Sequence, residues 1–132
     1  MFPSLFVLLH LAHLVADYPL QTDHQAGHKA LPGPAGWRAN LVHAGTHVAT
    51  GALALAVAAA VLDLDVGVLP GAAALLWIGA THAIIDRRRL VQWWMTHARQ
   101  TEWATRGGAA HVDQTAHVLA LAVAALTLTA LN

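Results

Sequence analysis

The chain has 132 residues, of which 57% are hydrophobic and only 11% are charged. Soluble domains carry about 25% charged residues, so this composition indicates a membrane protein and excludes disordered and coiled-coil classes. Seven basic and seven acidic residues cancel, which argues against a nucleic-acid partner, and the lack of cysteine excludes disulfides and thiolate chemistry. Ten histidines outnumber either charged class. These values predict one integral-membrane domain, residues 1–132, that contains a polar site.

Four apolar segments are predicted to cross the membrane as helices, at residues 3–18, 37–62, 72–86 and 110–131. Residues 90–103 contain three tryptophans and are predicted to form a helical segment along the membrane surface. The predicted fold is all-α: a four-helix transmembrane bundle, up-down-up-down, with this interfacial segment between its third and fourth helices. A soluble, alanine-rich helical bundle is the alternative architecture.

Basic residues set the predicted orientation. All seven lie at the connections that follow the first and third predicted helices, and none lies at the second connection or at either terminus. The positive-inside rule therefore places both basic connections in the cytoplasm and both termini outside.

Each predicted helix carries two potential metal ligands four residues apart. The pairs are His13 and Asp17, His43 and His47, His82 and Asp86, and Asp113 and His117. Residues four apart lie on one helical face. The pairs fall late in the first and third helices and early in the second and fourth, so they meet at the cytoplasmic end of an up-down-up-down bundle. Eight histidine and aspartate ligands predict two divalent ions, which we expect to be zinc, manganese or iron.

Missing residue types narrow the chemistry. Ser4 is the only serine and lies far from these pairs, which argues against a serine nucleophile. Glu102 is the only glutamate and lies outside the predicted spanning helices, which excludes both HExxH metalloproteases and Glu-x-x-His di-iron bundles. Metal-activated water is the direct hydrolytic route that remains.

The predicted function is a membrane-embedded, dinuclear metal-dependent hydrolase whose site opens at the cytoplasmic end of the bundle. Its expected substrate is a membrane lipid or another amphipathic anion that carries a phosphoester. Asp86 or Asp113 is predicted to bridge the metals and hold the attacking hydroxide. Arg87 or Arg88 is predicted to neutralise the phosphate.

Other functions fit the same pattern. A histidine-rich di-iron oxygenase or desaturase would use a similar bundle, and a metal carrier, a proton carrier or a structural His–Asp network would need no reaction. A homodimer is compatible with four short helices. The sequence leaves open whether the site includes five further polar residues: His10, Gln21, Asp23, His24 and His111.

The string LLHLAHLVADYPLQTD resembles the opening of a family of small bacterial and phage membrane proteins catalogued as a domain of unknown function. The matching residues are His13, Asp17, Tyr18, Leu20, Gln21, Thr22, His43 or His47, His82, Asp86, Asp113, Gln114 and His117. The chain is also similar to bacterial inner-membrane proteins described as metal-dependent hydrolases. This resemblance implies the bacterial inner membrane and supports the metal site, but it adds little about the substrate.

Overall fold

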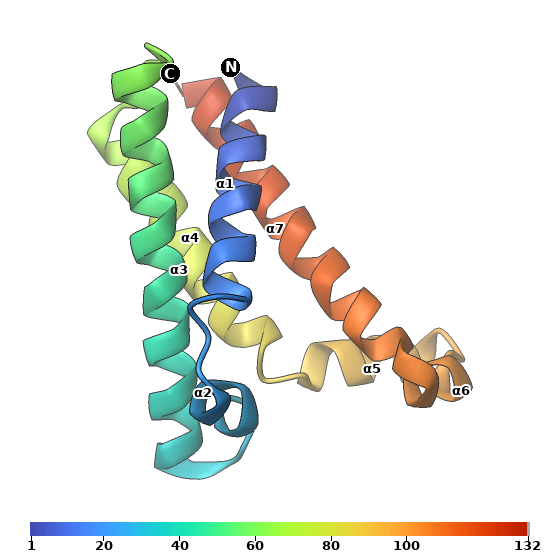
Figure 1. Ribbon diagram of the computed structural model, residues 1–132. Coiled ribbons are helices and arrows are strands. Elements are labelled where there is room, and N and C mark those ends of the chain that lie inside the picture. Colours follow the sequence, from blue (N-terminus) through green and yellow to red (C-terminus); the bar gives the residue numbers. More distant parts are fainter. Residues whose placement is uncertain (132) are drawn as a thin grey trace.

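The computed structural model describes residues 1–131, and within this range every regular element is a helix (Figure 1). The long helices are α1 (Phe2–Asp17), α3 (Gly33–Val61), α4 (Val68–Ile85) and α7 (Ala109–Leu131). The short ones are α2 (Asp23–His28), α5 (Arg89–His97) and α6 (Thr101–Trp103), and a kinked segment (Ala104–Gly108), in which Gly107 has a φ of 95°, joins α6 to α7. The all-α prediction is confirmed.

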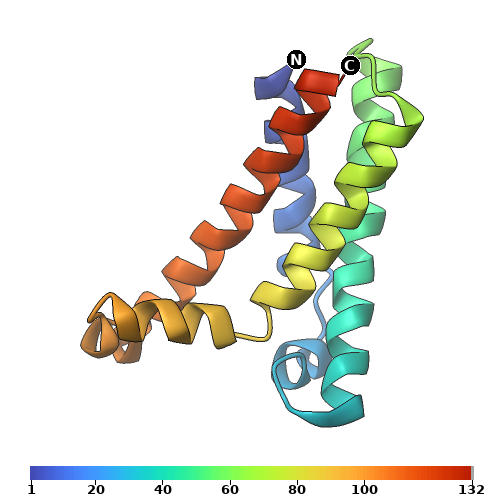
Figure 2. The same ribbon diagram turned by 180° about the vertical axis from the view of Figure 1, so that it is seen from behind.

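The long helices contact one another in a ring. Helix α1 packs against α3 and α7, and α4 also packs against α3 and α7. Successive long helices run in opposite directions, so the first and last described residues lie at the same end of the molecule (Figure 1). Toward the other end α7 leans away from α3, and α5 crosses between α4 and α7 (Figure 2). This second end carries α2 and α5, and with them the basic residues.

Within residues 1–131, three segments are long and apolar enough to cross a membrane: Gly33–Val61, Val68–Ile85 and Thr101–Leu131. Helix α1 has 16 residues, about 24 Å at 1.5 Å per residue, and is shorter than a typical ~30 Å hydrocarbon core. Large apolar side chains stand outward on these helices, with Leu53 67% and Leu76 74% exposed. Such surfaces are consistent with a membrane protein.

An apolar core fills the end of the molecule where the termini lie. Its buried members come from all four long helices and include Leu5, Leu9, Leu55, Ile78, Leu121 and Leu128. A smaller apolar cluster, Ile85, Val91 and Met95, joins α5 to α4 and α7 at the other end. The polar site lies between these two clusters.

Two predicted helix starts differ from the structure by four residues, and the other predicted boundaries of the long helices differ by at most one. Helix α3 begins at Gly33 rather than at residue 37, and α4 begins at Val68 rather than at residue 72. Pro70 lies in the first turn of α4, where its missing N–H has no helical partner to lose. The glycine- and proline-containing connections are therefore shorter than expected.

Helix α2 lies in the connection between the first two predicted helices, where no helix is predicted from the sequence. Thr22 accepts a hydrogen bond from the backbone N–H of Gln25 at 3.2 Å, and the Gln25 side chain accepts one from the Thr22 backbone N–H at 2.9 Å. This reciprocal capping box starts the helix, and its Thr-x-x-Gln signature is visible in the sequence. The expected surface segment is also divided, since Ala98–Gln100 separates α5 from α6.

Candidate metal centre

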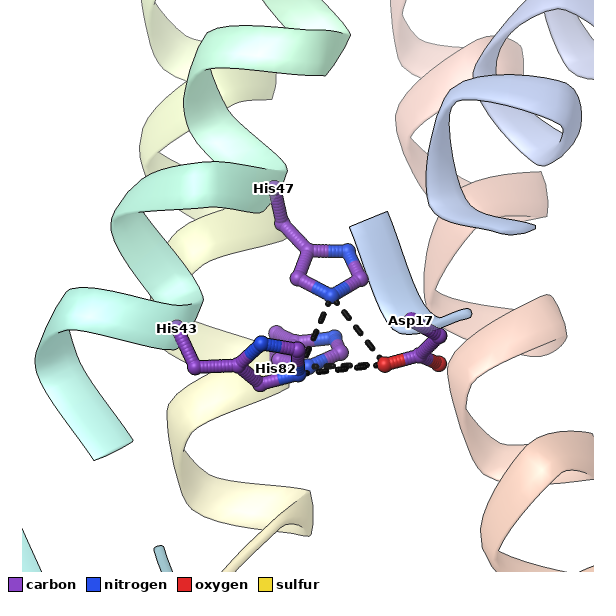
Figure 3. Close-up of side chains that lie close together, drawn as sticks. All are labelled: Asp17, His43, His47 and His82. Carbon is purple, nitrogen blue, oxygen red and sulfur yellow. Dashed lines mark hydrogen bonds and ion pairs between the residues drawn. The ribbon is translucent and has the colours of Figure 1, made fainter. Parts of the chain in front are cut away.

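Four buried side chains from three helices direct one atom each toward a common point (Figure 3). Asp17 is the last residue of α1, and His82 lies in the last turn of α4. His43 and His47 are one turn apart on α3. The carboxylate oxygen and the three ring nitrogens all lie within 4.8 Å of one another. We call these residues the four-ligand cluster.

The spacing of these atoms suits a divalent metal ion. A tetrahedral ion with bonds of about 2.0–2.1 Å holds its ligand atoms roughly 3.3 Å apart. Asp17 Oδ1 lies 3.1 Å from His43 Nε2, 3.3 Å from His47 Nε2 and 3.8 Å from His82 Nε2. The Nε2 atoms of His43 and His47 are 3.3 Å apart. These separations bracket the tetrahedral edge, and the ligand types suit zinc, iron or manganese.

Hydrogen bonds alone account for only part of this arrangement. His43 and His47 can each donate an Nε2–H to Asp17 Oδ1, at 3.1 and 3.3 Å. His82 Nε2 is buried 3.8 Å from Asp17 Oδ1 and 3.1 Å from Asp86 Oδ2, and among the described residues it makes no hydrogen bond of regular geometry. A buried nitrogen that lies between two carboxylates without such a hydrogen bond fits a metal ligand.

Contacts to the second oxygen of Asp17 hold its Oδ1 toward the cluster. Asp17 Oδ2 lies 3.2 Å from His13 Nε2 and accepts a hydrogen bond from Gln114 Nε2 at 3.3 Å. The predicted ligand His13 therefore lies behind Asp17, outside the four-ligand cluster. Carboxylates that bind metals are commonly held in this way by neighbouring hydrogen bonds. Gln114 was not predicted as a site residue because its amide is an uncommon metal ligand.

A second buried group consists of His82, Asp86 and His117. Asp86 Oδ2 lies 3.1 Å from His82 Nε2, and Asp86 Oδ1 lies 3.9 Å from His117 Nε2. His82 Nε2 is thus near both Asp86 and Asp17. One ring nitrogen has one lone pair and binds one ion, so His82 serves only one of the two groups at a time.

His117 is oriented as metal-binding histidines usually are. Its Nδ1 lies 2.9 Å from the backbone oxygen of Asp113 and 3.4 Å from the Asp113 carboxylate. An Nδ1–H donated to these oxygens leaves Nε2 as the free lone pair, and Nε2 is buried without a partner. The Asp113 carboxylate is 22% exposed and belongs to neither group. The structure therefore places Asp113 behind His117, not among the converging atoms.

Two carboxylates of the site stand where negative charge is disfavoured. Asp17 ends α1 and Asp86 follows the last residue of α4, and both side chains are buried. The C-terminal end of a helix carries partial negative charge, so both positions need a nearby cation. Lys29, which directly follows α2, supplies one: its Nζ lies 3.0 Å from Asp86 Oδ2.

The two predicted phosphate-binding arginines differ in their surroundings. Arg87 donates a hydrogen bond from Nη1 to the backbone oxygen of Lys29 at 2.9 Å, and its guanidinium lies 4.6 Å from the centre of the Trp37 ring. These contacts fasten the segment that carries Lys29. Arg88 is exposed and lines a polar pocket beside Asp86.

Two pockets adjoin the site. The polar pocket has a volume of about 630 Å³, and Lys29, Asp86, Arg88 and Asp113 are among the residues that line it. An apolar pocket of about 440 Å³ lies between α4, α5 and α7 and is lined by residues that include Trp93, Trp94 and Trp103. Val91 of α5 lines both. The site therefore lies next to one pocket that contains basic side chains and one pocket that is apolar.

The five polar residues left open by the sequence divide into two groups. Gln21 donates a hydrogen bond to the backbone oxygen of Asp17 at 2.8 Å, and the His10 ring stacks 6.4 Å from the His13 ring, so both adjoin the site. Asp23 is exposed at the start of α2. His24 stacks on His28, and His111 on Trp103, so neither joins the converging atoms.

Comparison with known families matches nearly the whole chain. The family model described as protein of unknown function, DUF3307, covers residues 5–132. The chain belongs to this family. The match confirms the resemblance to a domain of unknown function, whereas the similarity to metal-dependent hydrolases stays a prediction. No curated protein and no solved structure matches the chain. The description of DUF3307 names no activity.

Proposed function

We propose that this DUF3307 protein is a membrane-embedded, metal-dependent hydrolase that acts on a phosphoester of an amphipathic substrate. One observation carries the proposal. Oxygen and nitrogen atoms of Asp17, His43, His47 and His82 converge from three helices within 4.8 Å of one another, at a buried place in the structure.

Four transmembrane helices, α1, α3, α4 and α7, hold this site in the proposed bundle. Lys29, Arg38, Arg87, Arg88 and Arg89 lie at one end, together with α5, whereas Asp63 and Asp65 lie on the connection at the other. The positive-inside rule supports a cytoplasmic location for the basic end and a bacterial inner-membrane protein with both termini outside. Helix α5, with exposed Trp93 and Trp94, suits the headgroup region.

The residues around the cluster support hydrolysis. A divalent ion held by the four ligands would activate water only at a fifth coordination position, where it would lower the pKa of a water molecule from 15.7 to about 7. Asp86 lines the polar pocket, and its Oδ2 lies 3.6 Å from His43 Nε2 and 3.1 Å from His82 Nε2. We propose that this carboxylate takes up the proton that the water releases. Lys29 and Arg88 line the same pocket and provide positive charge for an anionic group.

The two pockets support an amphipathic substrate. An anionic head suits the polar pocket with its lysine and arginine, and a hydrocarbon chain suits the apolar pocket beside α5. We propose a membrane lipid or a similar phosphoester on this ground. A carrier would need ligands along a path across the bilayer, whereas an apolar core occupies the half of the molecule beyond the cluster.

The number of ions is a separate part of the proposal. The eight ligands predicted from the sequence would serve two ions. A second ion would be held by Asp86 and His117, with His82 as a further ligand if that ring is not used by the four-ligand cluster. His82 faces both groups, and Lys29 already contacts Asp86. We propose that the four-ligand cluster holds the tightly bound ion.

The proposal is tested with protein purified in mild detergent, stripped with a chelator and reloaded with zinc, manganese or iron. Phosphate release is measured from lipid phosphomonoesters and from a soluble aryl phosphate. We expect metal-dependent release by the wild type, loss in His82→Ala, and no change in Arg38→Met, which alters an exposed cation away from the cluster. Absence of release with every metal and both substrate types would refute the hydrolase.

A further inference from the structure

A buried lysine contacts the carboxylate that was expected to hold a second metal ion. Lys29 Nζ lies 3.0 Å from Asp86 Oδ2, and the Lys29 side chain is only 12% exposed. A lysine this deep is unusual unless it is paired. Its ammonium group is therefore part of the centre's charge, although it comes from the chain segment after α2 rather than from a long helix.

The same carboxylate oxygen faces the histidines. Asp86 Oδ2 lies 3.1 Å from His82 Nε2 and 3.6 Å from His43 Nε2. The lysine nitrogen thus approaches the oxygen through which Asp86 would bind or bridge an ion near these rings. A second divalent ion at Asp86 and the Lys29 ammonium compete for one oxygen and for one region of negative potential.

We propose that Lys29 is the resident second cation of this centre, so that the native protein binds a single divalent ion in the four-ligand cluster. This inference rests on the proposed metal site. Charge balance supports it: one divalent ion and Lys29 carry three positive charges, and Asp17, Asp86 and Asp113 carry three negative ones. A second divalent ion beside Lys29 would leave two excess positive charges in a largely buried site, which is costly.

The chain holds Lys29 in this position from three directions. The capping box of α2 orders the turn before it, and Arg87 donates a hydrogen bond to its backbone oxygen at 2.9 Å. The following residues lie against Gly36 of α3, where an added Cβ would be 1.9 Å from the backbone oxygen of Leu31. This close packing holds the backbone of Lys29 in place, so its ammonium group stays next to Asp86. A mobile surface lysine would not keep such a contact.

The test is a cobalt(II) titration of metal-free protein in detergent, followed by visible absorption and by metal analysis after gel filtration. The wild type is expected to bind one equivalent, and Lys29→Met two, because the freed Asp86 can then act with His117. Lys29→Arg keeps the charge and should bind one. The double variant Lys29→Met/Asp86→Asn should return to one, and Arg38→Met, a matched loss of an exposed cation, should also bind one.

The outcomes separate this inference from the proposed function. Two tightly bound equivalents in the wild type would overturn the role of Lys29, whether or not any variant folds. One equivalent in both the wild type and a folded Lys29→Met protein would overturn it as well, while leaving the four-ligand cluster intact. No bound metal in the wild type would instead refute the metal centre itself.

Discussion

Replacing Asp17 with asparagine removes the one charged ligand of the four-ligand cluster with little change in side-chain volume. Asp17 Oδ1 is the atom that all three histidines face, at 3.1, 3.3 and 3.8 Å. Four-ligand zinc sites in peptides bind with about 10–16 kcal/mol, so an equal share per ligand is about 3–4 kcal/mol. We therefore expect the Kd for zinc to rise by two to three orders of magnitude.

The assay is competition for zinc between the detergent-solubilised protein and a chromophoric chelator. Asparagine can still accept or donate a hydrogen bond at the position where Asp17 Oδ2 meets Gln114 and His13, so the fold should survive, which thermal unfolding checks. Asp23→Asn is the matched control, since Asp23 is exposed on α2. A Kd for folded Asp17→Asn within threefold of the wild type would refute Asp17 as a ligand.

Three further predictions concern the surroundings of the site. Gly36→Ala should lower the free energy of unfolding by about 1–3 kcal/mol, because the added Cβ would overlap the Leu31 carbonyl. Its control is Gly45→Ala, where an added Cβ would meet no neighbouring atom within 4 Å and should leave stability unchanged or raise it. Thermal unfolding compares the two variants. Arg87→Met removes the charged hydrogen bond to the backbone oxygen of Lys29, which is worth about 2 kcal/mol. Amide hydrogen exchange over residues 23–31 should therefore become roughly 30-fold faster, and unchanged exchange would show that Arg87 does not stabilise this segment. Gln114→Leu should weaken zinc binding by about 10-fold, as expected for a residue that positions a ligand, and an unaltered Kd would exclude that role.

Much of the fold follows from local sequence patterns. Apolar runs predict the long helices, and spacing by four predicts that His13 contacts Asp17 and that His82 contacts Asp86, which lie 3.2 and 3.1 Å apart. Both features depend on residues within one helix. Helix α2 was missed although Thr22 and Gln25 carry its capping signature, because glycine and proline nearby favoured a loop.

The division of roles within the site depends on contacts between distant residues. His13 and Gln114 meet Asp17 from the side away from the cluster, and Gln114 is 97 residues from Asp17 along the chain. Lys29 contacts Asp86 from the segment after α2, whose polar sequence predicts exposure to solvent. Helical spacing gives the face on which a side chain lies, but not which neighbour it meets. Ligands therefore cannot be separated from the residues that position them by spacing alone.

X-ray absorption at the metal edge of the zinc-loaded protein tests the central claim most directly, because it reports the atoms that surround the ion. The four-ligand cluster, with a water molecule as a further ligand, predicts four or five nitrogen or oxygen neighbours at roughly 2.0–2.1 Å, with the outer-shell scattering of three imidazole rings. His43→Ala should lose one ring's share of that scattering. A shell of oxygen atoms without imidazole scattering, or a wild-type protein that retains no zinc, would contradict the account.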